Sequence, residues 1–266
     1  MIQGGLASIT FRELSPAETV ACAVRAGLEA IEWGGDIHVP HGDIAKAREA
    51  RILTEDAGLR VASYGSYYRA GCESKDRKRP TFLEVLDTAV ALRAPAIRVW
   101  AGNRGSNDAD GTWRETVVAE TRRIADLAAQ AEIAIAFEFH GGTLTDTTES
   151  TCRLLETLDH HNVRTYWQTP LDLDEPARFE SLEHIIPWLG NLHVFHWRGF
   201  TREPLAQGAD AWRRYLAHAA TTGRCRFALL EFVEDDSPEY LLRDAQTLKE
   251  LLNDVQSESH GGGRHG

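Results

Sequence analysis

The chain has 266 residues, and its 29 Lys and Arg against 40 Asp and Glu give a formal net charge of −11. This balance argues against a nucleic-acid partner, because neutralising phosphates requires a basic surface, and no apolar stretch approaches the about 18 residues that a membrane span needs. The four cysteines form no CxxC pair and the amino terminus has no secretory pattern, so we expect a cytoplasmic protein with reduced thiols that acts on a small molecule.

Short apolar segments alternate with longer amphipathic segments along the chain. The first amphipathic segment opens with Ser15 and Pro16, which are typical of a helix N-cap and first turn, and it ends at Gly27. The longest one, residues 113–131, is predicted to be an amphipathic helix. The segments with the composition of strands span residues 5–9, 30–33, 60–64, 96–100, 133–139, 163–167, 191–195 and 227–232.

Strict alternation of eight strands with about eight helices predicts an α/β fold, a (β/α)8 TIM barrel formed by a single domain. A doubly wound sheet is the alternative. It usually carries a glycine-rich phosphate loop after an early strand, and the chain has no internal GxGxxG or GxxxxGK[ST] motif. No shift in composition marks a domain boundary. We therefore assign residues 1–252 to the barrel and expect residues 253–266, which end in GGGRHG, to form a disordered tail.

Polar side chains stand at the ends of the last four predicted strands, where barrel enzymes carry their chemistry. Glu138 and Glu231 end apolar strands, and a carboxylate there is costly unless it is paired or binds a cation. Gln168 follows the sixth strand and His193 lies in the seventh. Two carboxylates with a neutral amide and a neutral imidazole have a net charge of about −2, which matches the charge of a divalent ion. Oxygen-rich ligation favours Mn²⁺ or Mg²⁺, with Co²⁺ or Zn²⁺ as alternatives.

A structural role is the alternative for each of these residues, since a strand-end glutamate can pair with an arginine and His193 can be a hydrogen-bonded core residue. Their occurrence at four consecutive strand ends favours the metal. Four arginines are candidates for binding a phosphate or carboxylate of the substrate or for ordinary salt bridges: Arg69, Arg98, Arg198 and Arg202. The other strand-end residues include aromatic side chains of the kind that stack on sugar rings, and the candidates for substrate contact are Trp33, His38, Tyr67, Trp100, His140, His196 and Arg198.

The chain resembles the xylose isomerase-like TIM barrel superfamily, in its sugar phosphate isomerase/epimerase branch. The motifs are GLEAIEWGGDIHVPHGD, IAFEFHGGTLTDTTES, RTYWQTP, LGNLHVFHW with REPLAQG, and ALLEFV. In ketose epimerases of this kind, Glu, Asp, His and Glu from strands five to eight hold a divalent ion. The resemblance therefore implies Glu138, His193 and Glu231 as ligands and places Gln168 at the position of the usual aspartate. That departure removes one negative charge, with consequences for metal affinity and metal choice.

The resemblance further implies a metal-dependent isomerase or epimerase of a sugar, or of a sugar-like ketose or polyol, in carbohydrate metabolism. The metal would polarise a carbonyl and stabilise an ene-diolate, while Glu138 and Glu231 transfer the proton next to the carbonyl as the catalytic pair. Two alternatives stay open: a dehydratase of an inosose-like substrate on the same site, and a barrel that binds a sugar without turnover. Relatives of this kind are often dimers or tetramers, which implies a homo-oligomer.

Overall fold

The structure is a computed structural model that describes residues 1–72 and 79–261, with side chains up to residue 257. The barrel strands are β1 (Gln3–Ala7), β2 (Ala30–Gly34), β3 (Arg60–Arg69), β4 (Ala96–Trp100), β5 (Ala134–Phe137), β6 (Val163–Trp167), β7 (Leu189–Val194) and β10 (Phe227–Leu230). The helices are α1 (Pro16–Arg25), α2 (Ile44–Asp56), α3 (Phe82–Leu92), α4 (Gly111–Ala129), α5 (Thr148–Leu158), α6 (Glu175–Ile185), α7 (Ala209–Ala220) and α8 (Pro238–Gly261).

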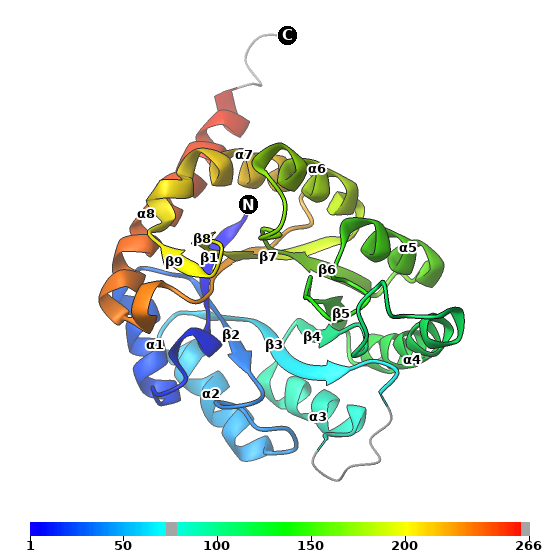
Figure 1. Cartoon of the computed structure of the whole chain (residues 1–266). Coiled ribbons are helices and arrows are strands. Elements are labelled where there is room, and N and C mark those ends of the chain that lie inside the picture. The colour runs from blue at the N-terminus through cyan, green and yellow to red at the C-terminus, as the bar shows by residue number, and fades with distance from the viewer. Residues whose placement is uncertain (73–78, 262–266) are drawn as a thin grey trace.

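The strands close into one barrel in the order β1-β10-β7-β6-β5-β4-β3-β2, and each pairs in parallel with its neighbours. Figure 1 looks down this barrel, with the helices arranged around its outside. The single-domain (β/α)8 TIM barrel predicted from the alternation of elements is thereby confirmed. The predicted N-cap is present too, because Ser15 Oγ accepts a hydrogen bond from the backbone N–H of Glu18 and forms a capping box with it.

Two segments differ from their prediction. Residues 196–203 form an antiparallel hairpin of β8 (His196–Arg198) and β9 (Thr201–Glu203), which the strand pattern did not predict. The expected disordered tail at 253–266 is wrong for residues 253–261, because α8 continues to Gly261. Val255 is buried and extends the apolar face that Leu248 and Leu251 begin, which favours continuation of the helix. Residues 262–266 lie outside the described part of the chain.

The interior of the barrel decides where the site lies. Alternate side chains of a strand point to the same face, and a buried cluster inside the barrel contains Ala30, Ala136, Tyr166 and Leu229, together with Ala62 and Phe227. Two residues further along the same four strands, the next inward positions carry the polar side chains Glu32, Glu138, Gln168 and Glu231. The apolar interior thus ends in a polar layer at the carboxyl ends of the strands.

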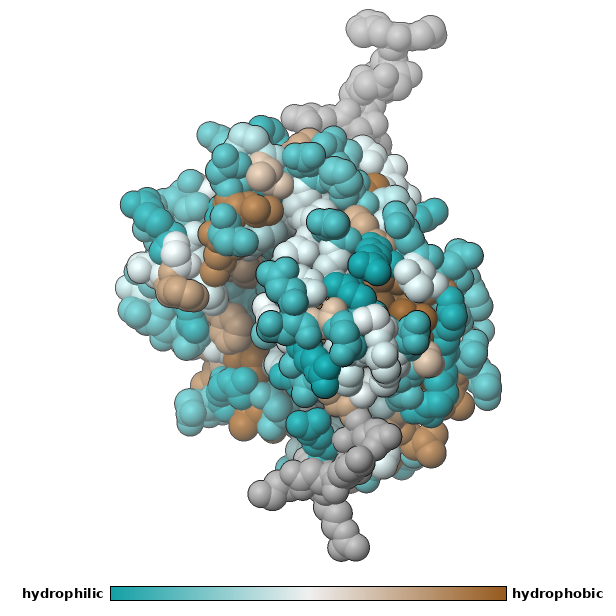
Figure 2. Space-filling view, turned by 45° about the vertical axis from the view of Figure 1, so that its right-hand side comes forward, coloured by the Kyte–Doolittle hydropathy of each residue, from teal (hydrophilic) through white to brown (hydrophobic). Residues whose placement is uncertain are grey.

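The face of the molecule that Figure 2 shows is predominantly polar. Figure 2 shows hydrophilic side chains over most of the visible face, with smaller hydrophobic patches between them. Of the helices in the described residues, none combines the length and apolar character required to cross a membrane. All four cysteines are free thiols, and Cys22 and Cys225 are buried.

Candidate metal centre

Three of the predicted ligands converge at the mouth of the barrel. One ligand atom from each of Glu138, His193 and Glu231 lies within 4.8 Å of the other two, and all three side chains are buried. Nδ1 of His193 lies 3.4 Å from Oε2 of Glu231 and 3.0 Å from Oε1 of Gln168. The structure therefore brings all four predicted ligands to one place, with Nδ1 as the imidazole atom that faces the oxygens.

These donors fit a divalent cation. Two oxygen atoms face one imidazole nitrogen, so their lone pairs repel unless a proton or a cation lies between them. Burial raises the pKa of Glu231 to about 7, with His193 opposing and Glu138 reinforcing the shift. For His193, burial favours a lower pKa, but the charges of Glu231 and Glu32 outweigh it and raise the pKa. Both shifts indicate a site that a bound divalent ion would stabilise.

Metal affinity should therefore rise with pH over the range in which Glu231, with its pKa of about 7, and His193, with its raised pKa, lose their protons. The metal binds ionised Glu231, so below its pKa of about 7 a proton competes for the carboxylate, and this group alone should lower the affinity by roughly tenfold per pH unit. Titration calorimetry with Mn²⁺, in two buffers of different ionisation enthalpy, would count the protons released. We expect more protons to be released at pH 6, where protons on Glu231 and His193 both compete with the metal, than at pH 8.5. Constant affinity without proton release would contradict the raised pKa.

A buried ion-pair network adjoins the ligands. Arg98 on β4 donates from Nε to Oε1 of Glu32 at 2.9 Å and from Nη1 to Oε2 of Glu138. Burial favours a higher pKa for Glu32, but Arg98 and then His193 outweigh it, so the pKa is lowered. Arg98 and Glu32 cancel in charge, which leaves the charges of Glu138 and Glu231 to match a divalent ion.

This network decides the role of Arg98 and includes Glu32, which was not predicted to belong to the site. Arg98 was a candidate for an acidic group of the substrate or for a salt bridge, and the structure pairs it with two buried carboxylates. Glu32 was not among the predicted site residues. The signal was available, because Glu32 is a carboxylate within an apolar strand, the same feature that drew attention to Glu138.

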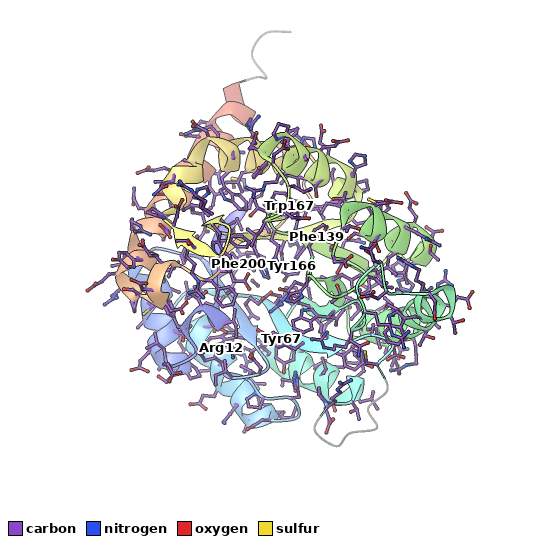
Figure 3. All side chains as sticks on the ribbon, in the orientation of Figure 1. Arg12, Tyr67, Phe139, Tyr166, Trp167 and Phe200 are labelled. Carbon is purple, nitrogen blue, oxygen red and sulfur yellow. The ribbon has the colours of Figure 1, made fainter. Side chains whose placement is uncertain are left out.

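An aromatic wall made of three predicted substrate residues stands beside Glu138. Trp100 donates from Nε1 to Oε2 of Glu138, and the His140 ring stacks on Trp100 with centroids 4.5 Å apart. Tyr67 meets Trp100 edge-on at 5.4 Å and points toward the middle of the barrel in Figure 3. Its φ of 54° is in the left-handed region, where a tyrosine is strained, as is frequent at functional sites.

Two other predicted substrate residues lie elsewhere. Trp33 is buried and donates from Nε1 to Oγ1 of Thr54 at 3.1 Å, so it packs between β2 and α2. Glu32 points into the barrel, and Trp33 must then point outward because successive side chains of a strand point to opposite faces. Trp167, next to Gln168, likewise faces α7 (Figure 3). His38 is also buried, with Nε2 3.1 Å from the carbonyl oxygen of Leu14, and burial lowers its pKa.

The last two predicted substrate residues belong to the β8–β9 hairpin. Nε2 of His196 lies 3.6 Å from Oε2 of Glu203, and Nη2 of Arg198 lies 3.3 Å from the same oxygen. Phe200 at the tip of the hairpin is 93% exposed. Both ion pairs lie within the hairpin, and a role in substrate contact stays a prediction for His196 and Arg198.

Comparison with known proteins gives a consistent picture. A family model described as xylose isomerase-like TIM barrel matches residues 20–251. A 3-dehydroshikimate dehydratase from Bacillus anthracis is 29% identical over 201 residues, which cover 71% of this chain and 69% of that protein. The crystal structure of a probable 3-DHS dehydratase from Bacillus anthracis has a TM-score of 0.76 at 23% identity and covers 94% of this chain and 99% of that one.

Two further solved structures share the fold. A xylose isomerase-like TIM barrel protein from Mycobacterium smegmatis, in complex with magnesium, has a TM-score of 0.73 at 14% identity, covering 95% of this chain and 97% of that one. D-Psicose 3-epimerase with D-tagatose, from Clostridium cellulolyticum H10, has a TM-score of 0.71 at 15% identity. The match covers 96% of this chain and 99% of that one.

Proposed function

The chain belongs to the xylose isomerase-like TIM barrel family, and from this premise we propose that it is a metal-dependent dehydratase of a polyhydroxylated cyclic ketone of the 3-dehydroshikimate kind. The observation that carries the proposal is the 29% identity over 201 residues to a 3-dehydroshikimate dehydratase. The buried Glu138, His193 and Glu231 cluster supports it, because it suits a divalent ion. The dehydratase alternative of the sequence analysis is thus preferred to the isomerase or epimerase.

The two glutamates suit such a reaction. Removing water from a β-hydroxy ketone requires a base for the proton next to the carbonyl and an acid for the departing hydroxyl. A bound divalent ion would supply polarisation of the carbonyl. Arg98 and Trp100 both donate to Glu138 and hold it as an oriented carboxylate. The pKa of Glu231, raised by burial to about 7, suits proton exchange near neutral pH.

Epimerisation of a ketose is the second candidate. It uses the same two proton-transfer groups but needs no leaving hydroxyl, and the convergence of Glu138 and Glu231 on one place favours it as well. The solved D-psicose 3-epimerase shares the barrel at 15% identity, a level at which the likeness concerns the fold alone.

One experiment separates these functions. The protein is incubated with Mn²⁺ in D₂O with 3-dehydroshikimate and, in parallel, with a panel of ketoses and inososes, and the products are followed by ultraviolet absorbance and NMR. Loss of water from 3-dehydroshikimate, with formation of an aromatic dihydroxybenzoate, is the expected result. Deuterium entering a ketose without loss of water would favour the epimerase. Saturable ligand binding without deuterium exchange or dehydration would overturn both catalytic proposals in favour of a binding protein.

A further inference from the structure

We infer that Glu32 is a positioning residue of the metal centre, which orients His193 directly and Glu138 through Arg98. This inference rests on the proposed metal-dependent function, since it concerns how the ligands of that metal are held. Glu32 is 1% exposed, and Oγ of Ser63 donates to its Oε2 at 2.7 Å. Oε2 of Glu32 is thus held by a residue of β3, whereas Oε1 is available to Arg98 and His193.

The first partner of Glu32 is the imidazole. Oε1 of Glu32 lies 3.4 Å from Nε2 of His193, and this nitrogen has no hydrogen-bond partner among the described side chains and backbone. Nδ1, on the other side of the ring, faces Gln168 and Glu231. A carboxylate beside Nε2 favours the tautomer with the proton on Nε2 and leaves the lone pair of Nδ1 for a metal. Metal-binding histidines are commonly held in this way.

The second partner is Arg98, which transmits the position of Glu32 on β2 to Glu138, which follows β5 three strands further round the barrel. Nε of Arg98 donates to the same Oε1 at 2.9 Å, and Nη1 donates to Glu138. A guanidinium is planar, so fixing its Nε edge fixes the direction in which Nη1 points. One carboxylate on β2 therefore sets the orientation of a ligand on β7 and of a ligand after β5.

A merely structural role for Glu32 would be to balance the charge of Arg98. That role predicts lower stability in its absence but no specific change in the metal or in His193. The positioning role also predicts weaker metal binding and an altered Nε2–H bond of His193. The two roles therefore differ in measurements other than activity.

The test is the affinity of the full chain for Mn²⁺, measured by electron paramagnetic resonance of free Mn²⁺, in wild type, Glu32→Gln and Ser63→Ala. We expect Mn²⁺ to bind Glu32→Gln about ten- to a hundredfold more weakly than wild type. Ser63→Ala keeps the carboxylate beside His193 and Arg98 and should change affinity much less. Equal affinity of wild type and Glu32→Gln would overturn the positioning role while leaving the metal centre intact. Absence of Mn²⁺ binding to wild type would overturn the proposed function itself.

A second measurement has a readout in the wild type that does not depend on the folding of a variant. In protein labelled with ¹⁵N-histidine and loaded with Mg²⁺, we expect a slowly exchanging, downfield imidazole N–H resonance from Nε2 of His193. It should persist in Ser63→Ala and shift upfield or vanish in Glu32→Gln. A wild-type Nε2 proton that exchanges freely, or a proton on Nδ1 instead, would overturn the inference.

Discussion

Replacing Glu231 by glutamine is expected to lower the turnover rate by about 10²- to 10⁴-fold while the barrel stays folded. Glutamine has nearly the same shape but cannot take up or release a proton, and it removes one of the two charges that match a divalent ion. Burial opposes the ionised form of Glu231 and raises its pKa to about 7, so the neutral side chain is compatible with the fold. The measurement is kcat at saturating Mn²⁺, with circular dichroism to verify the fold.

The matched control is Glu239→Gln, which makes the same chemical change at an exposed position in the first turn of α8. It should retain wild-type turnover. If Glu231→Gln also retains turnover with metal bound, Glu231 has no part in proton transfer and the assignment of the catalytic pair is wrong.

Replacing Arg98 by methionine is expected to destabilise the metal-free protein by about 3–5 kcal/mol. The substitution leaves Glu32 and Glu138 buried without the cation that they share, and unpaired buried charges are costly. Urea unfolding in the presence of a chelator measures the change. The chelator is needed because a bound metal would partly replace the missing positive charge.

The double variant Glu32→Gln/Arg98→Met tests the cause of this loss. Neutralising one of the two unpaired carboxylates should recover part of the stability, so the two substitutions should be strongly non-additive. Additive losses would show that Arg98 contributes through packing and not through its charge.

The stability of the metal-free protein should also depend on the raised pKa of Glu231. A carboxyl group whose pKa rises from 4.5 to about 7 on folding binds its proton more tightly in the folded state. Its contribution is therefore present in full below pH 4.5 and is lost as pH rises through 7. The difference between wild type and Glu231→Gln in chelator should change over this pH range, and a constant difference would contradict the pKa shift.

The barrel itself could be predicted from the sequence because its signals are local. Alternation of apolar segments with amphipathic ones, and helix starts such as Ser15 with Pro16, need no knowledge of distant contacts. Glu138 and Glu231 were recognisable for the same reason, since each follows an apolar strand. The hairpin at 196–203 was not recognisable, because its strands are only three residues long and contain no alternating pattern.

The sequence did not show which side chains of a strand point into the barrel. Trp33 and Glu32 are adjacent, so only one of them can point into the barrel, and composition alone does not say which one does. Trp33 was predicted to line the site, whereas the structure places Trp33 against α2 and Glu32 beside His193. Alternate residues of a strand point to the same face, so counting in steps of two from the inward-facing Ala30 places Glu32 inside the barrel.

The sequence by itself determined the (β/α)8 barrel and the strand ends that carry Glu138, Gln168, His193 and Glu231, because both depend on the order and spacing of neighbouring residues. Only the tertiary structure decided that Arg98 joins Glu32 to Glu138 across the barrel. Glu32 and Arg98 are 66 positions apart in the chain, and their contact depends on the order and register in which the strands close. The closure of the barrel determines which buried charges pair, because no local sequence pattern specifies which inward-facing side chains come into contact.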